Sequence, residues 1–194
     1  DRVAAEEHAL APLVASGRVA YRRRAENRGR KPGNIADWLD RHGDGFAHMM
    51  VLDADSWIRA DRIAGLVHRM ERTPELGLVQ TGMRLVPARS RFGRAQRTAS
   101  RLLGEPFVRG FAAWSGDTGN YWGHNALIRV AAFREAGALP RLPGRAPFGG
   151  DILSHDFVEA AQLRRAGWLI EVDPETRGSA EGGPQNLADF HRRD

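Results

Sequence analysis

Apolar and polar positions alternate along this chain with two different periods. Where apolar residues recur every three or four positions, the pattern predicts amphipathic helices. These helices are expected at residues 4–16, 34–43, 59–72, 131–137 and 154–167, with a longer helical segment over 91–113 that breaks near Pro106. Short, nearly continuous apolar runs predict strands, which are expected at residues 18–24, 47–55, 76–82, 121–130 and 168–174.

Turn residues predict where several of these elements begin and end. Gly17 should end the first helix, Asn34 should cap the second, and Gly43 should end it. A glycine- and proline-rich loop is expected over residues 27–34. Residues 47–55 form the type of apolar strand that is buried on both faces of a parallel sheet. The alternation of strands and helices predicts an α/β fold with three layers and a mostly parallel sheet.

The composition fits a single globular domain over residues 1–194. With 42% hydrophobic and 27% charged residues, the chain has the balance of a folded protein. It has no cysteine, which excludes disulfides and thiolate metal sites. No apolar run approaches the roughly 20 residues of a membrane span. Since the chain starts without a methionine and stops inside a charged segment, we expect it to be part of a longer protein.

The charge of the chain widens the range of partners. A net charge of +5 and a pI of about 10.7 suit nucleic acids, anionic lipids and phosphorylated small molecules. Lys31 is the only lysine among 29 basic residues, and such arginine usage more often follows genomic base composition than function. The arginines are spread along the chain without a known binding motif. A basic nucleic-acid-binding domain is therefore the rival interpretation from a different functional class.

The first chemical motif is "VLDADS", in which an apolar strand runs into Asp53 and Asp55. Side chains alternate across a strand, so both carboxylates should project to the same side and repel each other. A hard divalent cation between them would remove this repulsion. The alternative is that one aspartate caps the helix at 59–72 and the other is merely solvated. Because ligands collect at the carboxyl ends of strands in open α/β sheets, we favour a metal site.

Three further motifs add candidate residues. Lys31 in "RKPGN" precedes a helix N-terminus, where loop amides and the ammonium could hold a phosphate; an ordinary turn is the alternative. "YWGHN" combines aromatic faces with polar handles, which suits sugar rings; a packed tryptophan and a structural histidine are the alternative. Asp156, in the first turn of the helix at 154–167, is a candidate general base or a partner of the helix dipole.

The order of these motifs resembles the inverting family 2 glycosyltransferases. Within that family, "YRRRAENRGRKPGNIADW", "VLDADS", "YWGHNALIRV" and "LSHDFVEAAQLRRAGW" look most like the membrane glucosyltransferases that make osmoregulated periplasmic glucans. The resemblance runs from about Tyr21 to Asp194. Its specific part is "YWGHNA" together with "SHDFVEAA", whereas Asp-x-Asp alone is not specific.

The resemblance implies a GT-A-like nucleotide-sugar-binding fold, whose first strand, with an aspartate of its own, would precede this chain. Asp53 and Asp55 would contact UDP and a divalent metal, Mg²⁺ or Mn²⁺, and Lys31 would lie near the diphosphate. Asp156 would be the catalytic base. The acceptor sugar would be lined by Tyr121, Trp122, His124 and Asn125. His155 stands where many relatives carry glutamate, which leaves its role open.

The implied activity is transfer of glucose from UDP-glucose onto a growing β-glucan, on the cytoplasmic face of a bacterial inner membrane. The membrane helices of such proteins, and the Arg–Trp motif that caps their acceptor site, are absent from this sequence. Another family 2 β-glycan synthase, such as a cellulose-like one, is the nearest alternative, because these motifs do not identify the sugar.

Overall fold

The computed structural model describes residues 2–86, 88–145, 148–152 and 154–193. Within it the chain forms two compact units, Asp1–Asp37 and Trp38–Asp194, and each is described by itself. The expectation of one domain over residues 1–194 stays a prediction. No helix of the described residues is both long enough and apolar enough to cross a membrane.

The N-terminal unit holds α1 (Arg2–Ala15) and the first part of α2 (Arg30–His42). As expected, α1 stops before Gly17, which has a φ of 72°. The strand expected at residues 18–24 is wrong, since these described residues form no strand. Their arginines instead hold the turn before α2, because Arg24 donates to the carbonyl oxygens of Arg28 and Arg30 at 2.7 and 2.8 Å.

Helix α2 also begins four residues earlier than expected. Asn34 lies inside the helix and is not its N-cap, and its Oδ1 atom accepts a hydrogen bond of 2.7 Å from Arg22. The expected loop over residues 27–34 is therefore wrong in its second half. The other end was predicted correctly, since α2 stops at His42 and Gly43 begins a short 3₁₀ turn (Gly43–Gly45).

A four-stranded sheet forms the centre of the second unit, in the order β1 (His48–Val51), β5 (Ala126–Arg129), β3 (Leu76–Thr81) and β6 (Leu169–Asp173). Strands β1, β3 and β6 share one direction, as a mostly parallel sheet requires. Strand β5 runs against them, so that among the described strands of this sheet only β3 and β6 pair in parallel. The sheet is thus mixed in its pairing.

Burial in this sheet differs from the expectation for residues 47–55. Strand β1 is buried at alternate positions, with Met49 and Val51 covered and His48 and Met50 only half-buried. Strand β3 is the one that is buried along its whole length. The difference follows from position, because β3 lies between two neighbours whereas β1 ends the described sheet.

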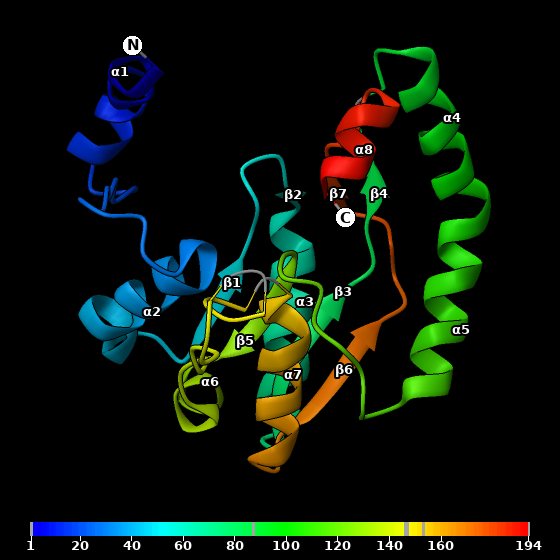
Figure 1. Ribbon diagram of the computed structural model, residues 1–194. Helices are drawn as coiled ribbons and strands as arrows, with labels where there is room; N and C mark the ends of the chain where they lie inside the picture. The colour runs from blue at the N-terminus through cyan, green and yellow to red at the C-terminus, as the bar shows by residue number, and fades with distance from the viewer. Residues whose placement is uncertain (1, 87, 146–147, 153, 194) are drawn as a thin grey trace. The chain divides into compact units, whose positions relative to one another are not determined.

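Helices cover both faces of the sheet, which confirms the three-layer prediction (Figure 1). Helix α3 (Ala60–Arg72) packs its apolar stripe on one face, where Leu66 and Met70 join Val79 of β3 and Leu127 of β5 in one buried cluster. Helices α6 (Val130–Ala136) and α7 (His155–Arg165) contact each other and cover the other face.

A second, three-stranded sheet was not predicted. It consists of β2 (Trp57–Ile58), β7 (Ser179–Glu181) and β4 (Arg84–Leu85), with β7 antiparallel to β2 and parallel to β4. Strands of two or three residues are too short to show a period in the sequence. Each of its strands follows a strand of the larger sheet along the chain: β2 follows β1, β4 follows β3 and β7 follows β6.

The long helical segment is present with a break of an unusual kind. Helices α4 (Arg91–Ala99) and α5 (Glu105–Ser115) are joined by a π-helical turn (Ser100–Gly104) that ends two residues before Pro106. Proline has no N–H to donate, and a π turn is one way in which a helix accommodates the missing hydrogen bond. The last described helix is α8 (Leu187–Arg193).

Candidate active site

The edge at which β1, β3 and β6 end gathers most of the candidate residues. Because β5 runs in the opposite direction, it begins at this edge: Val51, the last residue of β1, pairs with Ala126, the first residue of β5. Gln80 near the end of β3 pairs with the same alanine. The turn after β1 and the loop before β5 therefore emerge next to each other (Figure 1).

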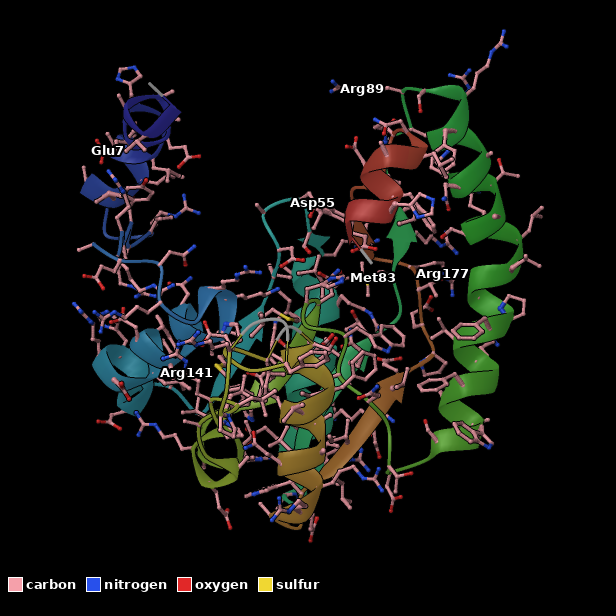
Figure 2. All side chains as sticks on the ribbon, in the orientation of Figure 1. Glu7, Asp55, Met83, Arg89, Arg141 and Arg177 are labelled. Atoms are coloured by element: carbon pink, nitrogen blue, oxygen red, sulfur yellow. The ribbon has the colours of Figure 1, made fainter. Side chains whose placement is uncertain are left out.

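Asp53 and Asp55 lie in this turn and not on the strand, which ends at Val51. The amide of Ser56 donates to the carbonyl oxygen of Asp53 at 3.0 Å, and the Ser56 hydroxyl accepts from the Asp53 amide at 3.1 Å. The argument from strand alternation is therefore wrong for this pair. The turn itself brings the two aspartates to the sheet edge, and Figure 2 shows Asp55 there.

The capping alternative for these aspartates is excluded by the start of α3. Its N-cap is Arg59, and no side-chain hydrogen bond caps this helix. Strand β2 separates the aspartates from it. Asp55 instead faces β7 and the residues after it, since a Cβ on Gly182 would lie 2.7 Å from Asp55 Oδ2. Neither aspartate therefore caps α3.

Asp156 occupies the first turn of α7, as predicted. Its Oδ1 atom accepts a hydrogen bond of 3.0 Å from the amide of Phe157, and no side-chain hydrogen bond from Ser154 caps the helix. The Oδ2 atom lies 3.5 Å from the position that a Cβ on Gly123 would take. The structure therefore places the candidate base directly against the "YWGHN" segment.

Residues 121–125 form an irregular loop and not the expected first half of a strand. Gly123 and Asn125 have positive φ angles of 82° and 49°, which a strand does not allow. Asn125 is fully buried and donates to Ser179 Oγ at 3.0 Å, so its side chain packs this loop. Thr81 Oγ1 donates to the Asn125 carbonyl oxygen at 2.7 Å.

Gln80 fixes the other end of the loop. It is fully buried, accepts a hydrogen bond of 2.8 Å from the amide of Trp122 and donates one of 2.9 Å to the carbonyl oxygen of His124. Sequence reasoning missed Gln80, Thr81 and Ser179 as supporting residues. The available signal was the polar end of the run "LGLVQTG", because buried polar residues need hydrogen-bond partners.

Two of the four predicted acceptor residues line a cavity of about 320 Å³. Trp122 and His124 lie in its wall with Phe107 of α5 and with Met83, which Figure 2 labels. His124 Nε2 lies 3.3 Å from an oxygen of Glu181. The side chains of Tyr121 and Asn125 are fully buried, so neither is exposed to a sugar in this structure.

The electrostatics of Tyr121 connect three carboxylates with one buried side chain. Burial raises the pKa of the Tyr121 hydroxyl well above 10.0, and the negative charges of Glu159, Asp156 and Asp53 raise it further. Asp53 follows β1, whereas Asp156 and Glu159 belong to α7. The tertiary structure therefore brings one half of the Asp-x-Asp motif and the candidate base to the same side chain.

The remaining candidates are Lys31 and the metal site. Lys31 lies in the first turn of α2 in the N-terminal unit, and its role beside a diphosphate stays a prediction. In the described part of the chain, no group of three or more histidine or acidic side chains could hold a metal. Mg²⁺ is a cation that takes one or two carboxylates and completes its shell with water and phosphate oxygens, so the metal site at Asp53 and Asp55 stays a prediction.

Comparison with known proteins agrees with the resemblance found in the sequence. The family described as "Glycosyl transferase family group 2" matches residues 48–194. The chain is 55% identical over 174 residues to the glucans biosynthesis glucosyltransferase H of Bradyrhizobium diazoefficiens. This alignment covers 90% of this chain and 23% of that protein. It is 51% identical over 191 residues to the protein of the same name from Rhodopseudomonas palustris, covering 98% of this chain and 27% of that protein.

A third relative with this name, from Xylella fastidiosa, is 48% identical over 194 residues, covering 98% of this chain and 30% of that protein. The chain thus spans less than a third of the length of the curated relatives it matches. The mixed α/β architecture is consistent with the GT-A-like fold that the resemblance implied. With a family match over residues 48–194, the chain belongs to glycosyl transferase family group 2.

Proposed function

We propose that this chain carries catalytic residues of a glucosyltransferase that moves glucose from UDP-glucose onto a growing β-glucan. The observation that carries the proposal is the position of Asp156 against Gly123, at the sheet edge where Asp53 and Asp55 lie. Names of the relatives support glucose as the transferred sugar and a glucan as the product. We further propose that the domain works on the cytoplasmic face of the bacterial inner membrane.

The donor side of the site would be formed by the two aspartates after β1. Inverting transfer is a single in-line displacement, in which UDP departs as a polyanion. A bound Mg²⁺ or Mn²⁺ neutralises the charge that develops on the leaving diphosphate. Asp53 and Asp55 would hold this cation, and Lys31 would add a positive charge near the diphosphate. Asp55 in particular sits in an exposed turn, where a nucleotide can reach it.

The acceptor side would be formed by α7 and the loop before β5. Asp156 would accept the proton of the attacking sugar hydroxyl, which contributes roughly 10² to 10⁴-fold to such reactions. Trp122 and His124 would orient the acceptor, since both line the cavity of about 320 Å³. An aromatic face beside a polar rim matches the apolar face and the hydroxyl edge of a sugar ring.

Calorimetric titration of the chain with UDP, in Mg²⁺, in Mn²⁺ and in EDTA, tests the donor assignment. We expect binding that requires the divalent cation and is lost in Asp55→Ala. The control is Asp61→Ala, which removes an exposed aspartate of α3 whose partner is Arg59. Equal affinity for UDP in EDTA, or in Asp55→Ala, would contradict the proposal.

The rival interpretations have their own readouts. Binding to duplex DNA with a steep salt dependence, without any response to UDP, would favour a basic nucleic-acid-binding domain. Analysis of the product made by the full-length protein would separate an osmoregulated periplasmic glucan from a cellulose-like polymer. The linkage between the sugars of this product identifies which of the two kinds of synthase made it.

A further inference from the structure

The Tyr121 hydroxyl is buried without a hydrogen-bond partner. The side chain is fully covered, and within the described residues its oxygen makes no hydrogen bond. A buried polar group of this kind costs free energy that a phenylalanine at the same place would not. Such a group therefore calls for an explanation.

The surroundings of this hydroxyl are acidic. Glu159 and Asp156 come from α7, and Asp53 comes from the turn after β1. Together with burial, these charges hold the pKa of Tyr121 well above its ordinary value, so the hydroxyl keeps its proton at neutral pH. A protonated hydroxyl among carboxylates can act only as a donor toward them.

The two carboxylates of α7 differ in their partners. Glu159, which is buried, has an oxygen 2.9 Å from His155 Nδ1. Asp156 uses Oδ1 to accept from the Phe157 amide, while its Oδ2 faces Gly123, two residues after Tyr121. The nearby histidine of the loop, His124, pairs with Glu181 of β7. His155 therefore engages one oxygen of Glu159, and Asp156 is the carboxylate whose Oδ2 faces the tyrosine's own loop.

We propose that Tyr121 is a positioning residue for Asp156: its hydroxyl donates to the Asp156 carboxylate when an acceptor is bound, and His155 keeps Glu159 from taking that hydrogen bond. This rests on the proposed function, because it assigns a support to the same base. It also gives a role to His155, which stands at a position where many members of the family carry glutamate.

The first test is Tyr121→Phe in the full-length protein, which removes one oxygen and keeps the ring. Loss of a hydrogen bond to a charged group should lower kcat about tenfold or more. The KM for UDP-glucose should stay within about twofold, since we assign this hydroxyl to Asp156 on the acceptor side of the site. The melting temperature should be unchanged or higher, because an unpartnered hydroxyl is removed. Tyr21→Phe, which changes the other tyrosine, is the matched control.

The second test couples the two residues. His155→Gln frees Glu159 to compete for the hydroxyl and should lower kcat in the wild-type background. In the Tyr121→Phe background the same change should have little further effect, because both substitutions act on the same hydrogen bond, the one from Tyr121 to Asp156. His48→Gln, in a pair with Glu71 away from the site, is the control for losing a histidine–glutamate pair.

Three results would overturn the inference. The Tyr121→Phe protein could transfer glucose as fast as the Tyr21→Phe protein, or it could have a lower melting temperature with both kcat and KM altered. The third result is that the losses of kcat add up in the double variant. Failure of the proposed function looks different. In that case the wild-type protein transfers no glucose from UDP-glucose, and UDP binding does not depend on Asp55.

Discussion

The Oδ2 atom of Asp156 lies 3.5 Å from the position that a Cβ on Gly123 would take, so the candidate base rests against the backbone of the loop before β5. These residues come from segments that are separated in sequence by α6 and a proline-rich loop. A glycine at this position keeps the space beside the carboxylate open, and the proposed acceptor hydroxyl would need that space to reach Asp156.

Gly123→Ala should therefore reduce glucosyl transfer. The new methyl group can be accommodated at ordinary contact distance, but it covers the face of Asp156 that we assign to the acceptor. The control is Gly137→Ala, which has nearly the same φ, 84° against 82°, and open space around its Cβ position. Both variants should lose about 1 to 2 kcal/mol of stability to backbone strain. Only Gly123→Ala should also lose activity; equal activity in the two variants would contradict the assignment.

Asp156→Asn should abolish glucosyl transfer in the full-length protein while leaving UDP-glucose binding nearly intact. The amide is almost isosteric but cannot accept the hydroxyl proton, so turnover should fall by about a hundredfold or more. Single-turnover assays and calorimetry on the same preparation separate chemistry from binding. A folded variant with near-normal glucan synthesis would instead support a role in the helix dipole alone.

Gly182→Ala should weaken the binding of UDP with its metal. A Cβ at this position would come within 2.7 Å of Asp55 Oδ2, so the carboxylate must move. Displacing the carboxylate that we assign to the metal should cost roughly tenfold in affinity. Gly183→Ala is the neighbouring control, since its Cβ would meet only Leu85, at 3.5 Å. Titration with UDP and Mg²⁺ should show the loss in the first variant alone.

Arg62→Ala should destabilise the fold by about 3 kcal/mol. Arg62 donates to Asp173 Oδ2 at 2.6 Å and to the Glu175 carbonyl oxygen at 2.7 Å, and both side chains of the ion pair are 13% exposed. The substitution leaves a nearly buried carboxylate with much less compensation. Arg59→Ala breaks an exposed pair with Asp61 and should change nothing measurable. Urea unfolding of both variants makes the comparison.

Stability should fall in alkali because of Tyr121. Its pKa is raised above the ordinary value of 10.0, so the folded state holds this proton more tightly than the unfolded state does. That contribution is fully present below about pH 10 and is lost as the pH rises through the folded pKa. In Tyr121→Phe the loss of stability above about pH 10 should be smaller than in the wild type. The absorbance of tyrosinate should show Tyr121 ionising only as the chain unfolds.

Local sequence patterns by themselves determined most of the elements and the position of the candidate base within its helix. Helix α3 was predicted from the spacing of its apolar stripe, and α7 was predicted with Asp156 in its first turn, because both patterns lie within one helix. Strands β3 and β6 followed from continuous apolar runs. The failures at residues 18–24 and 121–125 have a common reason, since a short apolar run does not show whether a partner strand exists.

Only the tertiary structure decided how the site is assembled. The positive φ of Asn125 depends on hydrogen bonds from Thr81 and to Ser179, which are distant in sequence, so no local pattern could indicate it. The turn at Asp53 and Asp55 replaces the expected strand because β1 stops pairing with β5 at Val51. The reversed direction of β5 brings residues 121–125 to the edge where β1 ends. Strand direction is set by packing between distant segments, and it is this packing that places Asp156 beside Gly123.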